Sequence, residues 1–204
     1  NYIAQVAPSL AIIADIRRDN LLHHLLFRAL FVEAATRGEF LARWIGRPLP
    51  PAALRSAPVD SLLARAARTP ATAATQAEAL RVVRERVRSF GFTLSAADLA
   101  TVERFHRAFI ADGVRLRFTS TGRAPQWYYP TLGQLLAERD REGRQASYLA
   151  SDSAFAVVRT MQREGRIVPV VGDLSGPVLD KIAALLRERR ESLRVLYTSN
   201  VEDY

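Results

Sequence analysis

Short apolar runs that end in polar residues alternate with longer stretches of helical periodicity along this chain. Four runs are typical of strands, because they are brief and rich in β-branched residues or alternate between apolar and polar positions. They span residues 9–18, 114–120, 166–173 and 193–200. The run IVPVV within the third is apolar throughout, as in a strand that is buried on both faces.

Helical periodicity fills most of the remaining sequence. The expected helices span residues 19–37, 38–46, 59–68, 75–90, 93–113, 131–143, 151–165 and 177–190. The fifth has the clearest ends, because Ser95 and Asp98 have capping-box spacing and Gly113 follows the last turn. Asp19 or Asn20 is expected to cap the first.

The order of these elements indicates an α/β fold. From residue 114 onward strands and helices alternate, which is typical of a mostly parallel sheet with covering helices. The helical block at about 38–112 is too long for a simple crossover between two strands. We therefore expect a single domain over 1–204 that contains a helical insertion.

Composition narrows the class of protein. The chain has no cysteine, which excludes disulfides, zinc–thiolate sites and cysteine nucleophiles. No apolar run approaches the ~18 residues of a membrane-spanning helix, and no signal peptide follows Asn1. We expect a cytoplasmic protein with no membrane partner. Because the chain starts without Met and stops directly after an expected strand, we also expect a piece of a longer protein, cut at both ends.

The charge is positive and uneven. The formal net charge is +8, and Lys181 is the single lysine among 29 basic residues. Residues 1–90 carry 13 basic and 7 acidic side chains, whereas residues 91–204 carry 16 and 14. This excess fits either a codon bias toward arginine or a surface for an anionic partner. The arginines of 81–89 recur on several sides of a helix, which favours a solvated surface over a nucleic-acid groove.

Polar residues follow each expected strand, at the edge where open parallel sheets bind ligands. These candidate site residues are Asp15, Ile16, Arg17, Ser120, Thr121, Gly172, Asp173, Ser199, Asn200 and Glu202. Acidic side chains there can accept hydrogen bonds from ribose hydroxyls, although Asp and Asn also cap helices and close turns. The motif GDLSGP is not a Walker loop, because Pro177 and Val178 stand where that loop needs Lys and Ser or Thr.

Other common sites have little support. Neither G-x-G-x-x-G nor G-x-S-x-G occurs in the sequence. His23 and His24 point about 100° apart on a helix and cannot chelate one ion, and His106 stands alone, so no metal site is expected. The loop PQWYYP, which contains Trp127, either stacks a base or packs against the domain edge.

Three segments together resemble an uncharacterised bacterial family whose members look like class I S-adenosylmethionine-dependent methyltransferases. They are residues 1–31, 147–177 and 195–204. The resemblance implies a Rossmann-like fold in which NYIAQVAP is the first helix and a glycine-bearing loop lies upstream of Asn1. One departure is that the strand 166–173 lacks the terminal tetrapeptide of amino-group methyltransferases. Methyl transfer to an adenine or glutamine nitrogen is therefore not supported.

The resemblance also gives the strand ends roles. It implies that Asp15 holds the cofactor ribose, with Ile16 and Gly172 beside it, and that Arg17 meets the methionine carboxylate or an acidic substrate. Asp173 would face donor and acceptor, and Asp173 or Glu202 would act as general base. Independently of the resemblance, the strand-end positions and the aromatic loop suggest that the substrate or crevice would involve Ser120, Thr121, Trp127, Ser199 and Asn200.

We therefore expect an S-adenosylmethionine-binding, methyltransferase-like protein whose acceptor the sequence does not identify. One alternative is a non-catalytic Rossmann-like scaffold that binds a partner through its helical block. Another is a nucleic-acid-binding module that uses the arginine-rich helices and Trp127–Tyr129.

Overall fold

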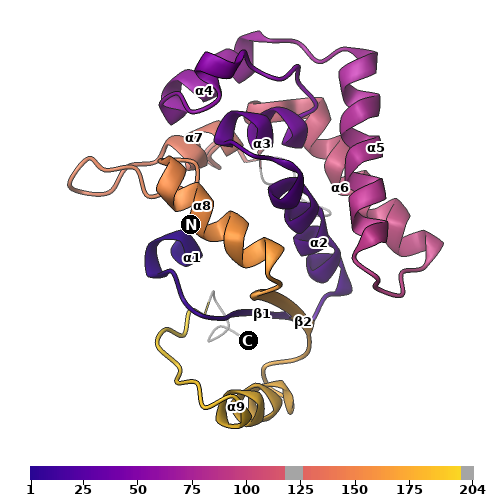
Figure 1. Cartoon of the computed structure of the whole chain (residues 1–204), viewed down its shortest axis with the longest axis vertical. Coiled ribbons are helices and arrows are strands. Elements are labelled where there is room, and N and C mark those ends of the chain that lie inside the picture. Colours follow the sequence, from indigo (N-terminus) through magenta and orange to yellow (C-terminus); the bar gives the residue numbers. More distant parts are fainter. Residues whose placement is uncertain (118–125, 199–204) are drawn as a thin grey trace.

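The computed structural model describes residues 1–117 and 126–198. Its elements are α1 (Tyr2–Val6), β1 (Ala11–Asp15), α2 (Arg18–Glu33), α3 (Arg37–Trp44), η1 (Ala52–Leu54), α4 (Val59–Arg68), α5 (Ala73–Ser89), α6 (Ala96–Asp112), η2 (Gly113–Arg115), α7 (Leu132–Ala137), α8 (Asp152–Arg163), β2 (Ile167–Val171) and α9 (Val178–Glu188). Figure 1 shows a body of helices above two short strands, with α9 on the other side of those strands.

The two strands form a small parallel sheet. The register pairs Ala11 with Ile167 at one end and Asp15 with Val171 at the other. The connection between them includes every helix from α2 to α8. Because the strands are parallel, both carboxyl ends lie at the same edge.

The expected Rossmann-like sheet is wrong, because the described chain is mostly helical and has two strands. Within 114–117, a 3-10 turn follows α6, and Arg117 makes an isolated antiparallel bridge with Thr131. No described residue of 193–198 is in a strand. Leu193 and Leu196 are 64% and 67% exposed, so this apolar run lacks the burial that a parallel strand needs. Alternating or apolar residues favour an extended chain locally, but a strand forms only where a second strand lies beside it to pair with.

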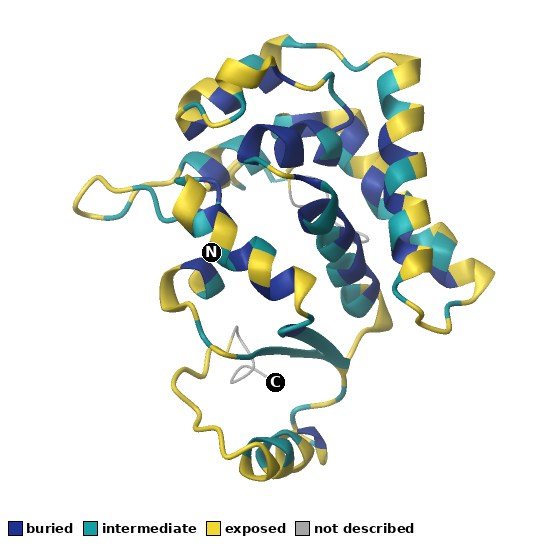
Figure 2. Ribbon diagram, in the orientation of Figure 1, coloured by how far each residue is buried: buried dark blue, intermediate teal, exposed yellow. Residues whose placement is uncertain are grey.

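The helical block is not an insertion in a sheet domain but supplies much of the core. α2 lies at the centre of the core and packs against α3, α5, α6 and α8. Figure 2 shows the buried stripe of α2 facing these helices. Phe40 of α3 is fully buried, with its ring centroid 4.4 Å from that of Phe31 and 5.7 Å from that of Phe155. Burial of rings from three helices joins this block to α2 and α8.

Several helix ends match their sequence signals. Ser95 and Asp98 form the expected capping box, and the N–H of Gly113 donates to the Phe109 carbonyl. The start of α2 differs from expectation, because its N-cap is Arg17 rather than Asp19 or Asn20. The carboxylate of Asp15 accepts the Arg17 N–H, which lets the helix begin directly after the strand.

A buried arginine ties the start of α3 to distant segments. The Arg37 side chain is 5% exposed and donates to the Asp152 carboxylate at 2.7 Å. It also donates to the carbonyls of Leu149 and Ser56, at 2.9 and 2.7 Å. These bonds satisfy a buried cation and fix α3 against the N-terminus of α8.

Candidate ligand site at the strand ends

The parallel register brings the ends of β1 and β2 together. The N–H of Gly172 donates to the Asp15 carbonyl at 2.9 Å, which extends the pairing one residue beyond β2. The predicted residues Asp15, Ile16, Arg17, Gly172 and Asp173 therefore lie along one edge. α2 begins three residues after Asp15, and α9 begins seven residues after Val171, so both helices start close to this edge (Figure 1).

Asp15 and Arg17 form a local ion pair at this edge. Oδ1 of Asp15 accepts the backbone N–H and the Nε–H of Arg17, at 2.8 and 3.1 Å, and Oδ2 accepts Nη2–H at 3.0 Å. Hydrogen bonding by Arg17 lowers the pKa of the Asp15 carboxyl below its ordinary value. Asp15 is therefore ionised at neutral pH.

His24 is a neighbour of Asp15 that the sequence did not assign to this site. Burial lowers the pKa of His24, and the negative charge of Asp15 partly opposes that shift. The only sequence signal was the position of His24 in the second turn of the helix that follows β1. A histidine at that position can also be a packing residue, so the strand-end geometry was needed to find its proximity to Asp15.

Asp173 occupies an exposed turn. Its Oδ1 accepts the Ser175 N–H at 2.9 Å, and its carbonyl accepts the Gly176 N–H at 3.1 Å. The hydrogen bonds from Ser175 lower the pKa of the Asp173 carboxyl. Turn closure is thus one role of this side chain, as the sequence alternative expected.

Gly172 is explained by packing. A Cβ at this position would lie 2.7 Å from Cγ2 of Val178 and 2.9 Å from its Cβ. The first turn of α9 approaches β2 this closely only because residue 172 has no side chain. Gly172 therefore shapes the edge by letting α9 approach β2.

The remaining predicted site residues fall into two groups. Ser120, Thr121, Ser199, Asn200 and Glu202 lie outside the described residues. Trp127 precedes α7, which lies well apart from the strands in Figure 1. A cavity of about 460 Å³ also lies elsewhere, between α1 and the start of α8, and its polar lining includes Gln5, Gln145 and Ser151.

The comparisons with known proteins give a family. One family, described as a domain of unknown function (DUF7790), matches residues 1–204. The chain belongs to the DUF7790 family. No curated protein and no solved structure matches this DUF7790 chain.

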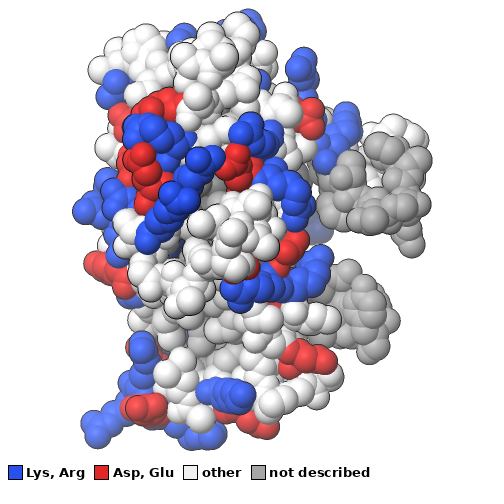
Figure 3. All heavy atoms as spheres, turned by 90° about the vertical axis from the view of Figure 1, so that its right-hand side faces the viewer, with Lys and Arg blue, Asp and Glu red and all other residues white. Residues whose placement is uncertain are grey.

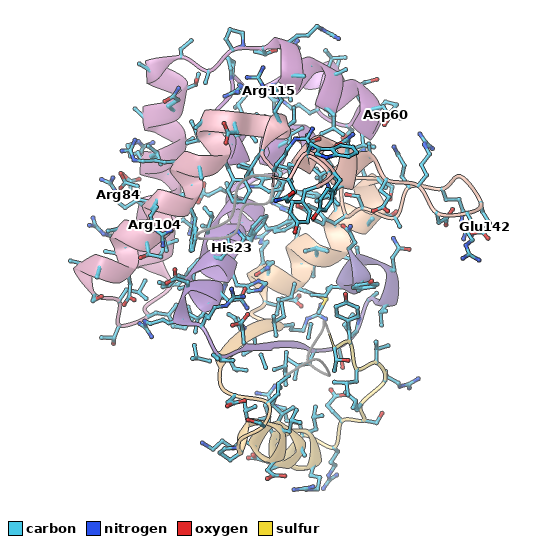
Figure 4. The ribbon with its side chains drawn as sticks, turned by 180° about the vertical axis from the view of Figure 1, so that it is seen from behind. His23, Asp60, Arg84, Arg104, Arg115 and Glu142 are labelled. Carbon is cyan, nitrogen blue, oxygen red and sulfur yellow. The ribbon has the colours of Figure 1, made fainter. Side chains whose placement is uncertain are left out.

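The arginine-rich surface of the DUF7790 chain is largely neutralised by ion pairs. Figure 3 shows acidic and basic side chains interspersed on the face of α5 and α6. Three of the four arginines within 81–89 are paired: Arg81 with Glu78 and Glu85, Arg84 with Glu103, and Arg86 with Glu33. On α6, Arg104 pairs with Asp19 and Arg107 with Glu103, and Figure 4 shows Arg84 and Arg104 on the same side of the molecule. Exposed arginines already paired with carboxylates make a poor phosphate-binding groove.

Two histidines are packing residues. The ring of His23 lies 5.0 to 5.7 Å from those of Phe27, Phe105 and Phe109, and burial lowers its pKa to about 4. His106 is buried, and its Nε2 lies 3.0 Å from the Arg43 carbonyl. Across residues 1–117 and 126–198, no three side chains of His, Asp or Glu gather as a metal site would require. Over the same residues, no helix combines the length and apolarity that crossing a membrane demands.

Proposed function

We propose that this DUF7790 chain binds S-adenosylmethionine at the edge formed by Asp15, Arg17, Gly172 and Asp173, as a methyltransferase-like protein. The observation that carries the proposal is the convergence of these residues at the carboxyl ends of two parallel strands. Ligands of α/β proteins bind at such edges, because strand ends and helix starts present unpaired polar groups there.

Charge supports this ligand. S-adenosylmethionine carries a carboxylate, an ammonium and a sulfonium, for a net charge of +1. Asp15, Arg17 and Asp173 sum to −1, because the lowered pKa values keep both carboxylates ionised at neutral pH. Opposite net charges favour association at a partly exposed site.

The Asp15 carboxylate can accept one more hydrogen bond, from a ribose hydroxyl. A carboxylate has about four lone-pair sites. Arg17 occupies two on Oδ1 and one on Oδ2. The remaining position on Oδ2 would accept a ribose hydroxyl, while the exposed guanidinium of Arg17 would meet the methionine carboxylate.

Asp173 is better suited to stabilise positive charge than to remove a proton. The bound cofactor would supply an electrophilic methyl group on its sulfonium. A carboxylate with a lowered pKa is a weak general base, so we assign Asp173 an electrostatic role opposite that sulfonium. The proposal places the protein in the cytoplasm, where this cofactor is made and used.

Isothermal titration calorimetry with S-adenosylmethionine and S-adenosylhomocysteine tests the proposal. We expect both to bind, and the second more weakly, because it lacks the sulfonium charge. Asp15→Asn should weaken binding about tenfold, the usual effect of losing one charge-assisted hydrogen bond. Asp180→Asn, on the exposed face of α9, is the matched control. An absence of heat with both ligands would favour a non-catalytic scaffold, and equal affinities of Asp15→Asn and the parent would exclude the ribose role.

A further inference from the structure

The segment from Gly113 to Ala137 is basic and aromatic. It contains three arginines and no acidic residue, and it includes the run Trp127–Tyr129. Within this segment, residues 116–117 lie beside residues 131–132, since the N–H of Leu132 donates to the Leu116 carbonyl at 2.8 Å and Arg117 bridges to Thr131. The aromatic run is therefore held next to the start of the segment.

The aromatic side chains face solvent. Trp127 is 86% exposed and Tyr128 is 61% exposed, whereas the other tryptophan, Trp44, is 2% exposed in the core. Ring centroids of Trp127 and Tyr128 are 6.1 Å apart, and those of Tyr128 and Tyr129 are 4.9 Å apart. An exposed tryptophan among other rings is unusual on a protein surface unless a ligand covers it.

The backbone beneath these rings is ordered by hydrogen bonds. Nη1 of Arg117 donates to the carbonyls of Trp127, at 3.0 Å, and of Tyr129. The N–H of Tyr129 closes a turn to the Gln126 carbonyl at 3.2 Å. Because the main chain is fixed from within, the rings project outward without needing contacts to the body.

Arg115 lies one residue before Leu116, whose carbonyl accepts the Leu132 N–H, and its charge is not paired with a carboxylate among the described residues. Arg115 is also exposed. Figure 4 places Arg115 beside α4 and the end of α6. Burial and the charge of Arg115 lower the pKa of Arg47, which indicates that two guanidinium groups lie near each other. The nearby carboxylate of Asp60 is already bonded to Arg139 and Gln145.

We propose that Trp127, Tyr128 and Arg115 form a binding surface for single-stranded nucleic acid. Unpaired bases would stack on the two rings, and Arg115 would contact a phosphate. Duplex bases are stacked on each other and cannot reach the rings, so single strands are preferred. This surface is separate from α5 and from the strand-end edge, so the proposal can be tested independently of cofactor binding.

The test is titration of the whole chain with fluorescently labelled ~10-nucleotide oligo(dT), oligo(U) and a duplex of equal length. We expect both single strands to bind and to quench the fluorescence of Trp127. Trp127→Ala and Tyr128→Ala should each weaken binding about 5- to 150-fold, the range for loss of one base-stacking partner. Arg115→Gln should reduce the slope of log affinity against log salt by about 0.7, which corresponds to one phosphate contact.

Phe92→Ala, which removes an exposed ring near the start of α6, is the matched control and should bind like the parent. Because Trp127 is mostly exposed, its alanine variant should keep the parent circular dichroism spectrum. The proposal is overturned if neither single strand binds at up to about 0.1 mM in low salt, the weak limit of non-specific binding. Equal binding of duplex, or parent-like affinity in both aromatic variants, would also overturn it.

Discussion

At the scale of single residues, the caps of α6 were predictable, whereas the cap of α2 and the long-range partners were not. Ser95, Asp98 and Gly113 lie within one helix, so their spacing in the sequence is sufficient to predict the caps. Asp98 also accepts both Nε–H and Nη2–H of Arg18, at 2.7 and 2.8 Å, across 80 positions of sequence. A single sequence contains no signal for that bond, because it depends on how α2 and α6 pack.

Buried histidines make stability depend on pH. Burial lowers the folded-state pKa of His23 from 6.5 to about 4, and it lowers the pKa of His106 in the same direction. When the folded-state pKa of a histidine is lowered, the unfolded state binds a proton more readily than the folded state. The free energy of unfolding is therefore largest above pH 6.5 and falls as the pH drops below that value. We expect urea denaturation to give a free energy of unfolding on the order of 1–2 kcal/mol smaller at pH 5 than at pH 7.5 from His23 alone.

His23→Phe is the diagnostic variant, because it keeps an aromatic ring among Phe27, Phe105 and Phe109. It should flatten the pH dependence of stability between pH 5 and 7.5. The exposed Arg88→Ala variant provides a baseline. An unchanged pH dependence in His23→Phe would show that His23 is protonated in the folded protein at pH 5.

At the scale of elements, helices were easier to place than strands. The range 59–68 matches α4, and the apolar pattern of 19–37 predicts the burial of α2. The runs at 114–120 and 193–200 have strand-like composition, but a strand exists only where another strand pairs with it. That pairing is a tertiary property, so composition predicted four strands where the described chain has two.

The junction of β2 and α9 gives a sharp prediction. Gly172→Ala would place a Cβ within 2.7 Å of Val178 and should lower the free energy of unfolding by about 1–3 kcal/mol. The double variant Gly172→Ala/Val178→Ala makes room for that Cβ and should recover part of the loss. Chemical denaturation of both variants measures the difference. If the double variant is no better than the sum of its single changes, the close approach is not the cause.

At the scale of the molecule, one core cluster extends from Ala4 to Ile167 and leaves the sheet end thinly covered. Nine of the fifteen exposed large apolar side chains in the described residues lie within 1–16 and 171–197, which places most uncovered apolar surface at that end. Only Val178 of α9 is buried, compared with six residues of α2. The carboxyl-edge residues were predictable because strand ends follow apolar runs, but this uneven coverage was not.

Local stability should be lower in the elements that have fewer buried residues. We expect backbone amides of α9 to exchange with deuterium about tenfold or more faster than those of α2, because few buried contacts oppose the opening of α9. Hydrogen exchange followed by mass spectrometry resolves the two helices, and α6 is a second protected reference. Equal protection of α9 and α2 would mean that α9 is anchored as firmly as the core.

The single lysine lies on the thinly covered helix α9, where it can be labelled selectively. Lys181 is exposed on α9, and every other basic side chain is arginine. An amine-reactive fluorophore therefore has one side-chain target in 204 residues, on the helix that the core holds least. A dye placed there would follow the distance between α9 and the helical body, with Trp44 as the fixed donor in the core and Trp127, the other tryptophan, replaced by Phe.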